Sequence, residues 1–319
     1  MQYSTIMDKT LLIYLRHELR SFRMADEQAA RLAEMLSGWR VTNAHTEAEF
    51  LAALPGAAVV CCWTFRQEWF ALAPRLRVVS TPAAGKDYFS VEWPPQVEHW
   101  NGGFHGALMA ETAVGMLLGM TRGLLPAVTT WREAAWPRPQ LDAVMRPLAG
   151  SRVTICGFGK IGHCIGELLK GFGAHLWGVS AHEQLAPKWF DKYDKCFITN
   201  NLDNILPATD HLVLVLPRTS ATDGLLDARR IALLPPHATV CNLGRGNAID
   251  ETALVAALAA GRLGGACLDV QGTEPLPADS PLRRCPNLWL FPHSSALSPN
   301  YMDLYAAEIA ERLARNSQL

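Results

Sequence analysis

Short apolar runs alternate with helical patterns over the first hundred residues of the chain. The runs LLIYL (11–15), AAVVCCW (57–63) and LRVVST (76–81) are separated by helical patterns at 25–36 and 47–54. Continuous runs of this kind, without polar alternation, are typical of strands that are covered on both faces. Strands that alternate with helices predict a parallel sheet flanked by helices, which is an α/β fold class.

A second and more regular α/β segment begins at Arg152. It follows an apolar helix predicted over 106–125 and an irregular stretch that begins near Trp131. Helices fit between most of its strands, for example at 160–170 and 251–260, so the pattern predicts a doubly wound sheet. The strands predicted in this segment are 152–156, 175–179, 195–199, 211–217, 238–243, 265–270 and 288–292.

The first turn of the second segment reads ICGFGKIG (155–162) and contains the spacing G-x-G-x-x-G. That spacing alone is a weak signal, but here a strand precedes it and a helix follows it. Gly157 permits the tight turn, Gly159 lets the backbone approach a pyrophosphate, and Gly162 lets the helix pack closely on the strand. A helix N-terminus attracts phosphate, so we predict a dinucleotide site. Further backbone donors are expected from Phe158, Lys160 and Ile161.

The residue that normally selects between NAD and NADP is unusual in this chain. About 20 residues after the glycine turn, where an acidic residue would bind the ribose 2′-hydroxyl of NAD, the sequence has Ser180. The arginine that often follows in NADP-binding proteins is absent as well, because Ala181 and His182 stand there. A hydroxyl can donate to a 2′-phosphate and does not repel it. The pattern favours NADP(H) and leaves NAD(H) possible.

Composition excludes several classes of protein. The 319 residues suggest about two domains, and the formal net charge of −1 provides no basic excess for nucleic acid or an anionic membrane. The start lacks the features of a signal peptide, and no apolar run approaches the roughly 18 residues needed to span a bilayer. Eight cysteines without a C-x-x-C pair indicate no metal site, and reduced thiols in a cytoplasmic protein are expected.

The C-terminal third contains a series of short motifs in a fixed order. The motifs are Asn242, Arg245-Gly246, Ala253-Leu254, Leu268-Asp269-Val270, Glu274-Pro275 and Pro292-His293. In this order and spacing they resemble the D-isomer specific 2-hydroxyacid dehydrogenase family, and upstream segments at 83–87, 109–122 and 216–226 extend the resemblance over nearly the whole chain.

The resemblance assigns a catalytic role to three residues. Arg245 would hold the substrate carboxylate and polarise its carbonyl, because a guanidinium is planar and permanently charged. His293 would exchange the proton, since its ordinary pKa of about 6.5 lies near neutrality. Glu274 would orient the imidazole and stabilise its charged form. Glutamate at this position, where the formate dehydrogenase branch has glutamine, favours interconversion of 2-oxo and 2-hydroxy acids.

Further contacts follow from the resemblance. Asp269 would hold the nicotinamide carboxamide, and Ala84 and Gly85 would offer backbone N–H groups to the substrate carboxylate, together with Arg245 and His293. Aromatic residues near these loops, Trp63 among them, could favour a bulkier or apolar substrate side chain, but core packing explains them equally well. The remaining residues expected at the cofactor are Leu216, Pro217, Thr222 and Leu243.

The resemblance also implies an architecture. A flavodoxin-like substrate domain (1–102) would be completed by a C-terminal helix (297–319), a Rossmann cofactor domain would span 103–296, and the active site would occupy the cleft between them. Ser298 and Pro299 are expected to begin the last helix. The protein is expected to form a homodimer through the long helix after residue 106, with a small 2-oxo or 2-hydroxy acid as its ligand.

The predicted function is NAD(P)-dependent interconversion of a 2-oxo acid and a D-2-hydroxy acid, in practice as a reductase of the glyoxylate/hydroxypyruvate type. Two alternatives remain open at this point. One is a nucleotide-sensing scaffold without catalysis, as in the corepressors of this family. The other is a dehydrogenase of another small anion such as phosphite.

Overall fold

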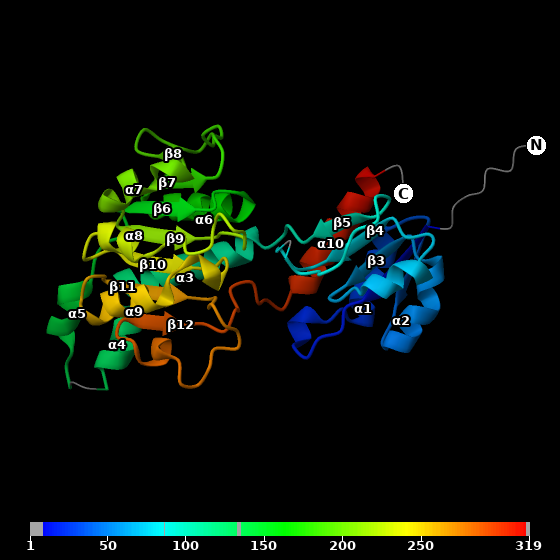
Figure 1. The fold of residues 1–319 in the computed structure, drawn as a ribbon, viewed down its shortest axis with the longest axis horizontal. Helices are drawn as coiled ribbons and strands as arrows, with labels where there is room; N and C mark the ends of the chain where they lie inside the picture. Colours follow the sequence, from blue (N-terminus) through cyan, green and yellow to red (C-terminus); the bar gives the residue numbers. More distant parts are fainter. Residues whose placement is uncertain (1–8, 86, 133–134, 317–319) are drawn as a thin grey trace, which may run out of the picture. The chain divides into compact units, whose positions relative to one another are not determined.

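The computed structural model describes residues 9–85, 87–132 and 135–316. The chain divides into two compact units (Figure 1), which are described separately below. Unit 1 comprises Met1–His105 and Leu297–Leu319, and unit 2 comprises Gly106–Ala296. The predicted substrate domain spans residues 1–102 and 297–319, and its residues 1–8 and 317–319 lie outside the described residues. No helix in the described ranges is both long and apolar enough to cross a membrane.

Unit 1 is built on a parallel sheet with the strand order β2-β1-β3-β4-β5. The helices α1 and α10 pack against each other, and the sheet core contains Leu12, Val60 and Val79. The strands are β1 (Lys9–Tyr14), β2 (Trp39–Asn43), β3 (Val59–Cys62), β4 (Val78–Thr81) and β5 (Glu98–Asn101). The helices are η1 (Arg20–Phe22), α1 (Asp26–Met35), α2 (Glu47–Ala53), η2 (Leu54–Gly56), η3 (Gln67–Leu72) and α10 (Tyr301–Arg315).

The start of α10 differs from the prediction. The expected N-cap Ser298 and Pro299 precede the helix, which begins at Tyr301 with Asn300 as its N-cap. The carbonyl of Ser298 accepts from the Tyr301 N–H at 3.1 Å, and the Ser298 hydroxyl contacts the Asn300 side chain. A turn therefore occupies 298–300, and the polar side chains expected to cap the helix stabilise that turn instead.

Unit 2 contains a parallel seven-stranded sheet with the order β12-β11-β10-β9-β6-β7-β8. The chain leaves β6 toward β7 and later returns on its other side with β9, so the strand order reverses at β6. In doubly wound sheets, ligands bind outside the carboxyl ends of the strands at this reversal. The strands are β6 (Arg152–Cys156), β7 (His175–Ser180), β8 (Lys195–Ile198), β9 (His211–Leu214), β10 (Thr239–Asn242), β11 (Gly265–Leu268) and β12 (Leu288–Leu290).

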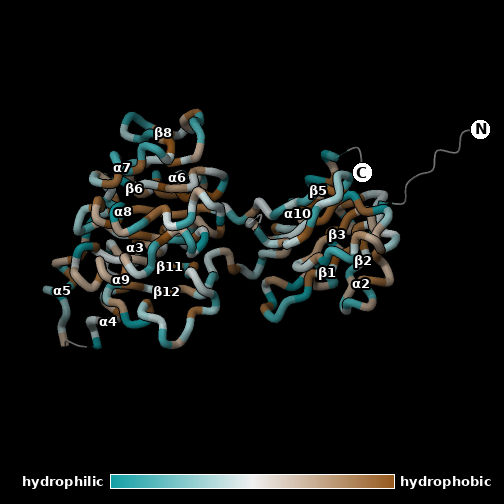
Figure 2. Tube along the Cα trace, in the orientation of Figure 1, coloured by the Kyte–Doolittle hydropathy of each residue, from teal (hydrophilic) through white to brown (hydrophobic). Residues whose placement is uncertain are grey.

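Apolar side chains cover both faces of this sheet. Ile155 and Val213 face one buried cluster together with Leu117 of α3, whereas Leu212 and Leu214 face a second cluster. Figure 2 shows hydrophobic residues concentrated along the strands of both units. The helices of unit 2 are α3 (Gly106–Thr121), α4 (Leu124–Thr130), α5 (Arg138–Val144), α6 (Lys160–Lys170), α7 (Leu202–Ile205), α8 (Ala228–Leu233) and α9 (Glu251–Ala259), with η4 (Thr199–Asn201), η5 (Leu206–Ala208), η6 (Gly246–Ala248) and η7 (Pro281–Arg284).

The helix predicted over 106–125 is two helices in the structure. It is interrupted between α3 and α4 by Gly123, whose φ of +68° lies outside the right-handed helical region. The segment read as irregular contains the short helix α5 as well. The fold class is as predicted: two α/β units, each with a parallel sheet.

Candidate active site

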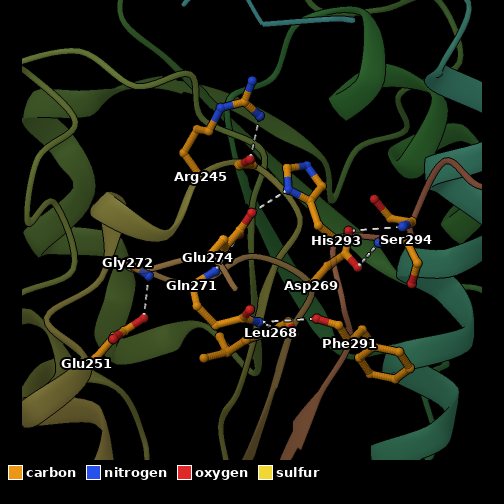
Figure 3. A network of polar contacts seen from close by, with 12 residues as sticks. Arg245, Glu251, Leu268, Asp269, Gln271, Gly272, Glu274, Phe291, His293 and Ser294 are labelled. Atoms are coloured by element: carbon orange, nitrogen blue, oxygen red, sulfur yellow. Dashed lines mark hydrogen bonds and ion pairs between the residues drawn. The ribbon is translucent and has the colours of Figure 1, made fainter. Parts of the chain in front are cut away.

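The groups with expected chemistry lie just after three neighbouring strands of unit 2. Arg245 follows β10, Asp269 follows β11 and His293 follows β12, and these strands pair in parallel as β10–β11–β12. Because the carboxyl ends of parallel strands meet at one edge of a sheet, the three residues occupy the same edge. Glu274 reaches it from the loop that follows β11 (Figure 3).

His293 and Glu274 form a direct side-chain pair. The imidazole Nδ1 lies 2.8 Å from Glu274 Oε2, while Glu274 Oε1 accepts from the Gln271 N–H at 2.9 Å. The side chains are 50% and 35% exposed, respectively. With Nδ1 occupied by the carboxylate, Nε2 is the ring nitrogen that can exchange a proton with a ligand. No side chain or backbone group among the described residues is bonded to Nε2.

The backbone of His293 adopts an unusual conformation. Its φ is +51°, in the left-handed region that non-glycine residues rarely occupy. Such a conformation persists only where the surroundings enforce it, and it is found more often at functional sites. In this turn the His293 N–H donates to the Asp269 carbonyl at 2.8 Å.

Asp269 holds the turn that carries His293. Its carboxylate is fully buried, and its two oxygens accept the N–H groups of Ser294 at 2.7 Å and Ser295 at 3.0 Å (Figure 3). Hydrogen bonds to a charged acceptor are stronger than those between neutral groups. The carboxylate thus fixes residues 293–295 against the end of β11. We expected Asp269 at the nicotinamide; its observed partners are backbone groups of this turn.

The turn that carries Arg245 is fixed by Asn242 and by a glycine. Asn242 Oδ1 accepts from the Gly244 N–H at 3.1 Å, and its Nδ2 donates to the Arg245 carbonyl at 2.9 Å. A Cβ on Gly246 would lie 1.9 Å from the carbonyl carbon of Gln271, so only glycine allows this approach. The turn after β10 therefore rests on the backbone after β11, three residues before Glu274.

The glycine turn follows β6 on the same edge of the sheet. Gly157 has a φ of +94°, and a Cβ there would lie 2.3 Å from the Val215 carbonyl oxygen. A Cβ on Gly162 would lie 2.5 Å from the Gly157 oxygen, which agrees with close packing of helix on strand. A Cβ on Gly159 would have no atom within 4 Å and would face open space. The turn thus leaves room beside Gly159, where a pyrophosphate would approach.

The N-terminus of α6 can receive an anion. No side chain caps this helix, so the N–H groups of Lys160, Ile161 and Gly162 have no intrahelical acceptor. One of the expected donors already has an acceptor within the protein, however. The Phe158 N–H donates to the Val179 carbonyl at 3.0 Å, and the side chain of Phe158 is buried in the core. The turn fits the pyrophosphate of a dinucleotide without a contribution from the Phe158 N–H.

Ser180 ends β7, the strand next to the glycine turn. Its hydroxyl is buried and has no hydrogen-bond partner among the described residues. A buried polar atom without a partner is uncommon in native structures. The hydroxyl is therefore a candidate for contact with the ribose of a dinucleotide. Nearby, Gln184 donates to the Phe158 carbonyl at 3.2 Å and ties the segment after β7 to the glycine turn.

The other expected cofactor residues lie after β9 and β10. Thr222 is bonded to the Pro217 carbonyl at 2.7 Å and so closes the loop that follows β9. The Leu243 N–H donates to Leu214 at 2.9 Å, and a Cβ on Gly244 would lie 2.4 Å from the Leu216 nitrogen. These loops therefore adjoin each other at the carboxyl edge of the sheet.

Ala84 and Gly85 belong to unit 1 and follow β4. The Ala83 carbonyl accepts from the Gly102 N–H at 3.0 Å, and the Gly85 carbonyl accepts from Asn101 at 2.6 Å. The bond to the Ala83 carbonyl fixes the peptide plane that carries the Ala84 N–H, which points opposite to that carbonyl, as in any trans peptide. Within the described part of the chain, the N–H groups of Ala84 and Gly85 have no acceptor.

A sequence model of the NAD binding domain of D-isomer specific 2-hydroxyacid dehydrogenases matches residues 114–295, more than half of the chain. The chain belongs to this family. The match includes the glycine turn, Arg245, Asp269, Glu274 and His293.

Individual proteins that are similar to this chain support the family assignment. D-3-phosphoglycerate dehydrogenase of Mycobacterium tuberculosis is 30% identical over 271 residues, 82% of this chain and 50% of the relative. Glyoxylate/hydroxypyruvate reductase B of Pectobacterium carotovorum is 30% identical over 249 residues, 76% of each. The family member of Xanthobacter autotrophicus, solved with NADPH and MES, has a TM-score of 0.78 at 25% identity, covering 96% of this chain and 95% of that one. This chain spans about half the length of the phosphoglycerate dehydrogenases it matches.

The side chains that hold this family's motifs in place were not predicted from the sequence. Glu251, the first residue of α9, accepts from the Gly272 N–H at 2.7 Å, and Gln271 donates to the carbonyls of Leu268 and Phe291 (Figure 3). Their local sequence gives no signal, because the partners are backbone groups of distant loops.

Burial raises the pKa of the Cys156 thiol, just before the glycine turn, to about 12. That thiol stays protonated and is no nucleophile near neutral pH.

The Asp269 carboxylate provides a test of this arrangement. We expect Asp269→Asn to lower the free energy of unfolding of the cofactor-free protein by about 1–3 kcal/mol, because the amide would face the Ser294 or Ser295 N–H with a second donor. Urea denaturation measures the change. Asp250→Asn is the matched control, since Asp250 caps α9 and asparagine caps equally well. Unchanged stability of Asp269→Asn would mean that this carboxylate does not hold the turn.

Proposed function

We propose that this protein is an NAD(P)-dependent oxidoreductase that interconverts a 2-oxo acid and a D-2-hydroxy acid, and that it acts as a reductase. The observation that carries the proposal is the 2.8 Å pair of His293 and Glu274 on the sheet edge that also bears Arg245. The names of the relatives, which include glyoxylate/hydroxypyruvate reductase, support the class of reaction. A histidine paired with glutamate can donate a proton to a carbonyl. A nucleotide-sensing scaffold has no need of such a donor, and a phosphite dehydrogenase has no carbonyl to protonate.

The residues of unit 2 divide the chemistry among them. A bound NADPH or NADH would supply the hydride that is added to the C2 carbonyl carbon. Arg245 binds the carboxylate and draws electron density toward the carbonyl oxygen as negative charge develops there. His293 donates a proton from Nε2 to that oxygen, and Glu274 stabilises the imidazolium before the transfer. In the oxidative direction the neutral imidazole accepts the proton.

We further propose that unit 1 contributes to carboxylate binding. The N–H groups of Ala84 and Gly85 lack acceptors within the described residues, and the adjoining carbonyls are fixed by Asn101 and Gly102. A backbone N–H that is held as that of Ala84 is binds a carboxylate without reorganisation. A side chain at position 85 would crowd the ligand, which explains glycine there.

The proposed cofactor is NADP(H), with NAD(H) as the weaker alternative. Ser180 replaces the acidic residue that would repel a 2′-phosphate, and its hydroxyl has no partner within the described chain. A family member of comparable fold was solved with NADPH. The residues proposed to hold the pyrophosphate are Gly157, Gly159, Lys160, Ile161 and Gly162, and those proposed beside the nicotinamide half are Leu216, Pro217, Thr222, Leu243 and Asp269.

The first experiment measures initial rates with NADPH and NADH against glyoxylate, hydroxypyruvate, pyruvate and phenylpyruvate. We expect rapid oxidation of NADPH with at least one acid. His293→Ala should lower kcat by about 10²–10⁴-fold, because it removes the general acid. Arg245→Ala should lower kcat and raise KM together, because the guanidinium binds substrate and transition state.

The control for these variants is His237→Ala. His237 pairs with Asp210 near the amino end of β10, away from the catalytic edge, and its removal should leave the rates within about twofold. NADPH fluorescence tests whether each variant still binds cofactor. Near wild-type turnover of His293→Ala would refute the catalytic assignment. Cofactor binding without turnover of any acid would favour the scaffold. Turnover of phosphite with NADP⁺ or NAD⁺, and of no 2-oxo acid with the reduced cofactors, would favour the phosphite dehydrogenase.

Cofactor choice is tested at Ser180. Ser180→Asp should lower kcat/KM for NADPH at least tenfold and change that for NADH less, because a carboxylate repels the 2′-phosphate at short range. Ser180→Ala, which removes the hydroxyl without adding charge, serves as the matched control and should shift the ratio only slightly. An unchanged NADPH/NADH ratio in Ser180→Asp would place the ribose away from the end of β7.

We also propose that the protein forms a homodimer through α3 and the adjoining α4 region, as the family resemblance implies. Trp131 and Trp136 are 58% and 69% exposed, and Leu124 and Val128 of α4 are exposed beside them in the sequence. Exposed apolar groups at this density are typical of an interface. Sedimentation velocity at micromolar concentration should give one dimeric species, which Trp131→Glu should convert to monomer. A monomeric wild type would contradict the proposal.

A further inference from the structure

Four aromatic side chains adjoin the substrate loop of unit 1, and we call them the aromatic wall: His17, Phe22, Trp63 and Tyr88. The ring centroid of Trp63 lies 5.7 Å from Phe22, 5.8 Å from Tyr88 and 5.9 Å from His17. Trp63 directly follows β3, and Tyr88 follows β4 beyond Gly85. The wall thus stands at the carboxyl ends of neighbouring strands, next to the proposed carboxylate-binding amides.

The wall is held firmly in place. The indole Nε1 of Trp63 donates to the Phe22 carbonyl at 2.8 Å, so the polar atom of the indole is used and its faces are apolar. Phe22 packs on Tyr301 with a centroid distance of 4.7 Å, and the Tyr301 hydroxyl donates to the Pro82 carbonyl at 3.3 Å. The wall is therefore tied to the beginning of the substrate loop through Pro82 and to its end through Tyr88.

The wall differs from the aromatic core beneath it. Phe65 and Trp69 are 4% and 3% exposed and belong to the core cluster of unit 1. Tyr88, in contrast, is 43% exposed, and Trp63 and Phe22 are half-buried. Core packing accounts for Phe65 and Trp69, but it leaves part of the wall open to a ligand.

Two of the guanidinium groups around the wall already have acceptors of their own. Arg23 donates to the His17 carbonyl at 2.9 Å, and Arg66 pairs with Glu47 at 2.9 Å. Arg16 donates through Nε to the Ala44 carbonyl at 3.0 Å, while its buried Nη2 has no hydrogen-bond partner among the described residues. The substrate loop itself carries the carboxyl group of Asp87. A phosphate on the substrate would meet apolar rings and a carboxylate here, and the guanidinium groups of Arg23 and Arg66 are directed to other acceptors.

We propose that the aromatic wall binds the side chain of the substrate, and that the substrate class is 2-oxo acids with a large apolar, preferably aromatic, group on C3. This inference rests on the function proposed above and specifies its substrate. Aromatic rings bind a phenyl group by burial of apolar surface and by edge-to-face contacts. Each additional methylene in a hydrophobic pocket changes kcat/KM by about 10–200-fold.

The test is a substrate series of increasing apolar size with the wild-type enzyme: glyoxylate, pyruvate, 2-oxobutanoate, 4-methyl-2-oxopentanoate and phenylpyruvate. We expect kcat/KM to rise along the series, with phenylpyruvate at least tenfold above pyruvate. 3-Phosphohydroxypyruvate, which carries a dianion on C3, should be at least tenfold below pyruvate. A maximum at glyoxylate or pyruvate, or a preference for the phosphorylated acid, would overturn this inference but leave the proposed function intact. Turnover of none of the acids would overturn the proposed function itself.

Variants of Trp63 assign the preference to the wall. Trp63→Ala should lower the phenylpyruvate/pyruvate ratio of kcat/KM at least tenfold, mainly through KM for phenylpyruvate, while Trp63→Phe should keep most of it. The matched control is Trp39→Ala at the amino end of β2, which removes a tryptophan of the same unit and should leave the ratio unchanged. If Trp63→Ala does not fold, Trp63→Phe and Tyr88→Ala are compared in its place. An unchanged ratio in Trp63→Ala, or in Tyr88→Ala where that variant replaces it, would refute the role of the wall.

Discussion

Close contact between loop backbones is the constraint on which the site of unit 2 depends. A Cβ on Gly157 would lie 2.3 Å from the loop after β9, and one on Gly246 would lie 1.9 Å from the loop after β11. Contacts this close exclude every side chain at both positions. They bring the glycine turn, the arginine turn and the Glu274 loop into one continuous surface at the carboxyl edge of the sheet.

Hydrogen bonds position His293 in the same way. The Asp269 carboxylate, buried after the central strand of the three, accepts two backbone N–H groups from the turn after β12. Glu274 in turn bonds the Gln271 N–H with one oxygen and the imidazole with the other. The turn of His293 is thus held by the carboxylate of a neighbouring loop, and Glu274 is held by a backbone N–H of its own loop. Such an arrangement pre-organises a site before any ligand arrives.

The sequence predicted the motifs and the parallel sheets but not the contacts that link them. Strands β6, β9 and β10 were visible because both of their faces are buried. The edge strands β2 (WRVTN) and β5 (EHWN) were missed, because half-exposed strands carry polar residues that resemble loops. The partners of the Phe158 N–H and of the Asp269 carboxylate were not predicted. These partners, Val179 and Ser294–Ser295, lie far away along the chain and cannot be inferred from local sequence.

The last helix, α10, determines when unit 1 can be completed. Its Glu308 accepts from the Gly103 N–H at 2.8 Å, and its buried Tyr305 bonds Ser80 at 2.8 Å, so β4 and the chain before α3 depend on it. All of unit 2 is synthesised between these partners. On the ribosome, unit 2 therefore has its whole sequence available for folding first, whereas the sheet of unit 1 waits with an exposed apolar face until α10 emerges.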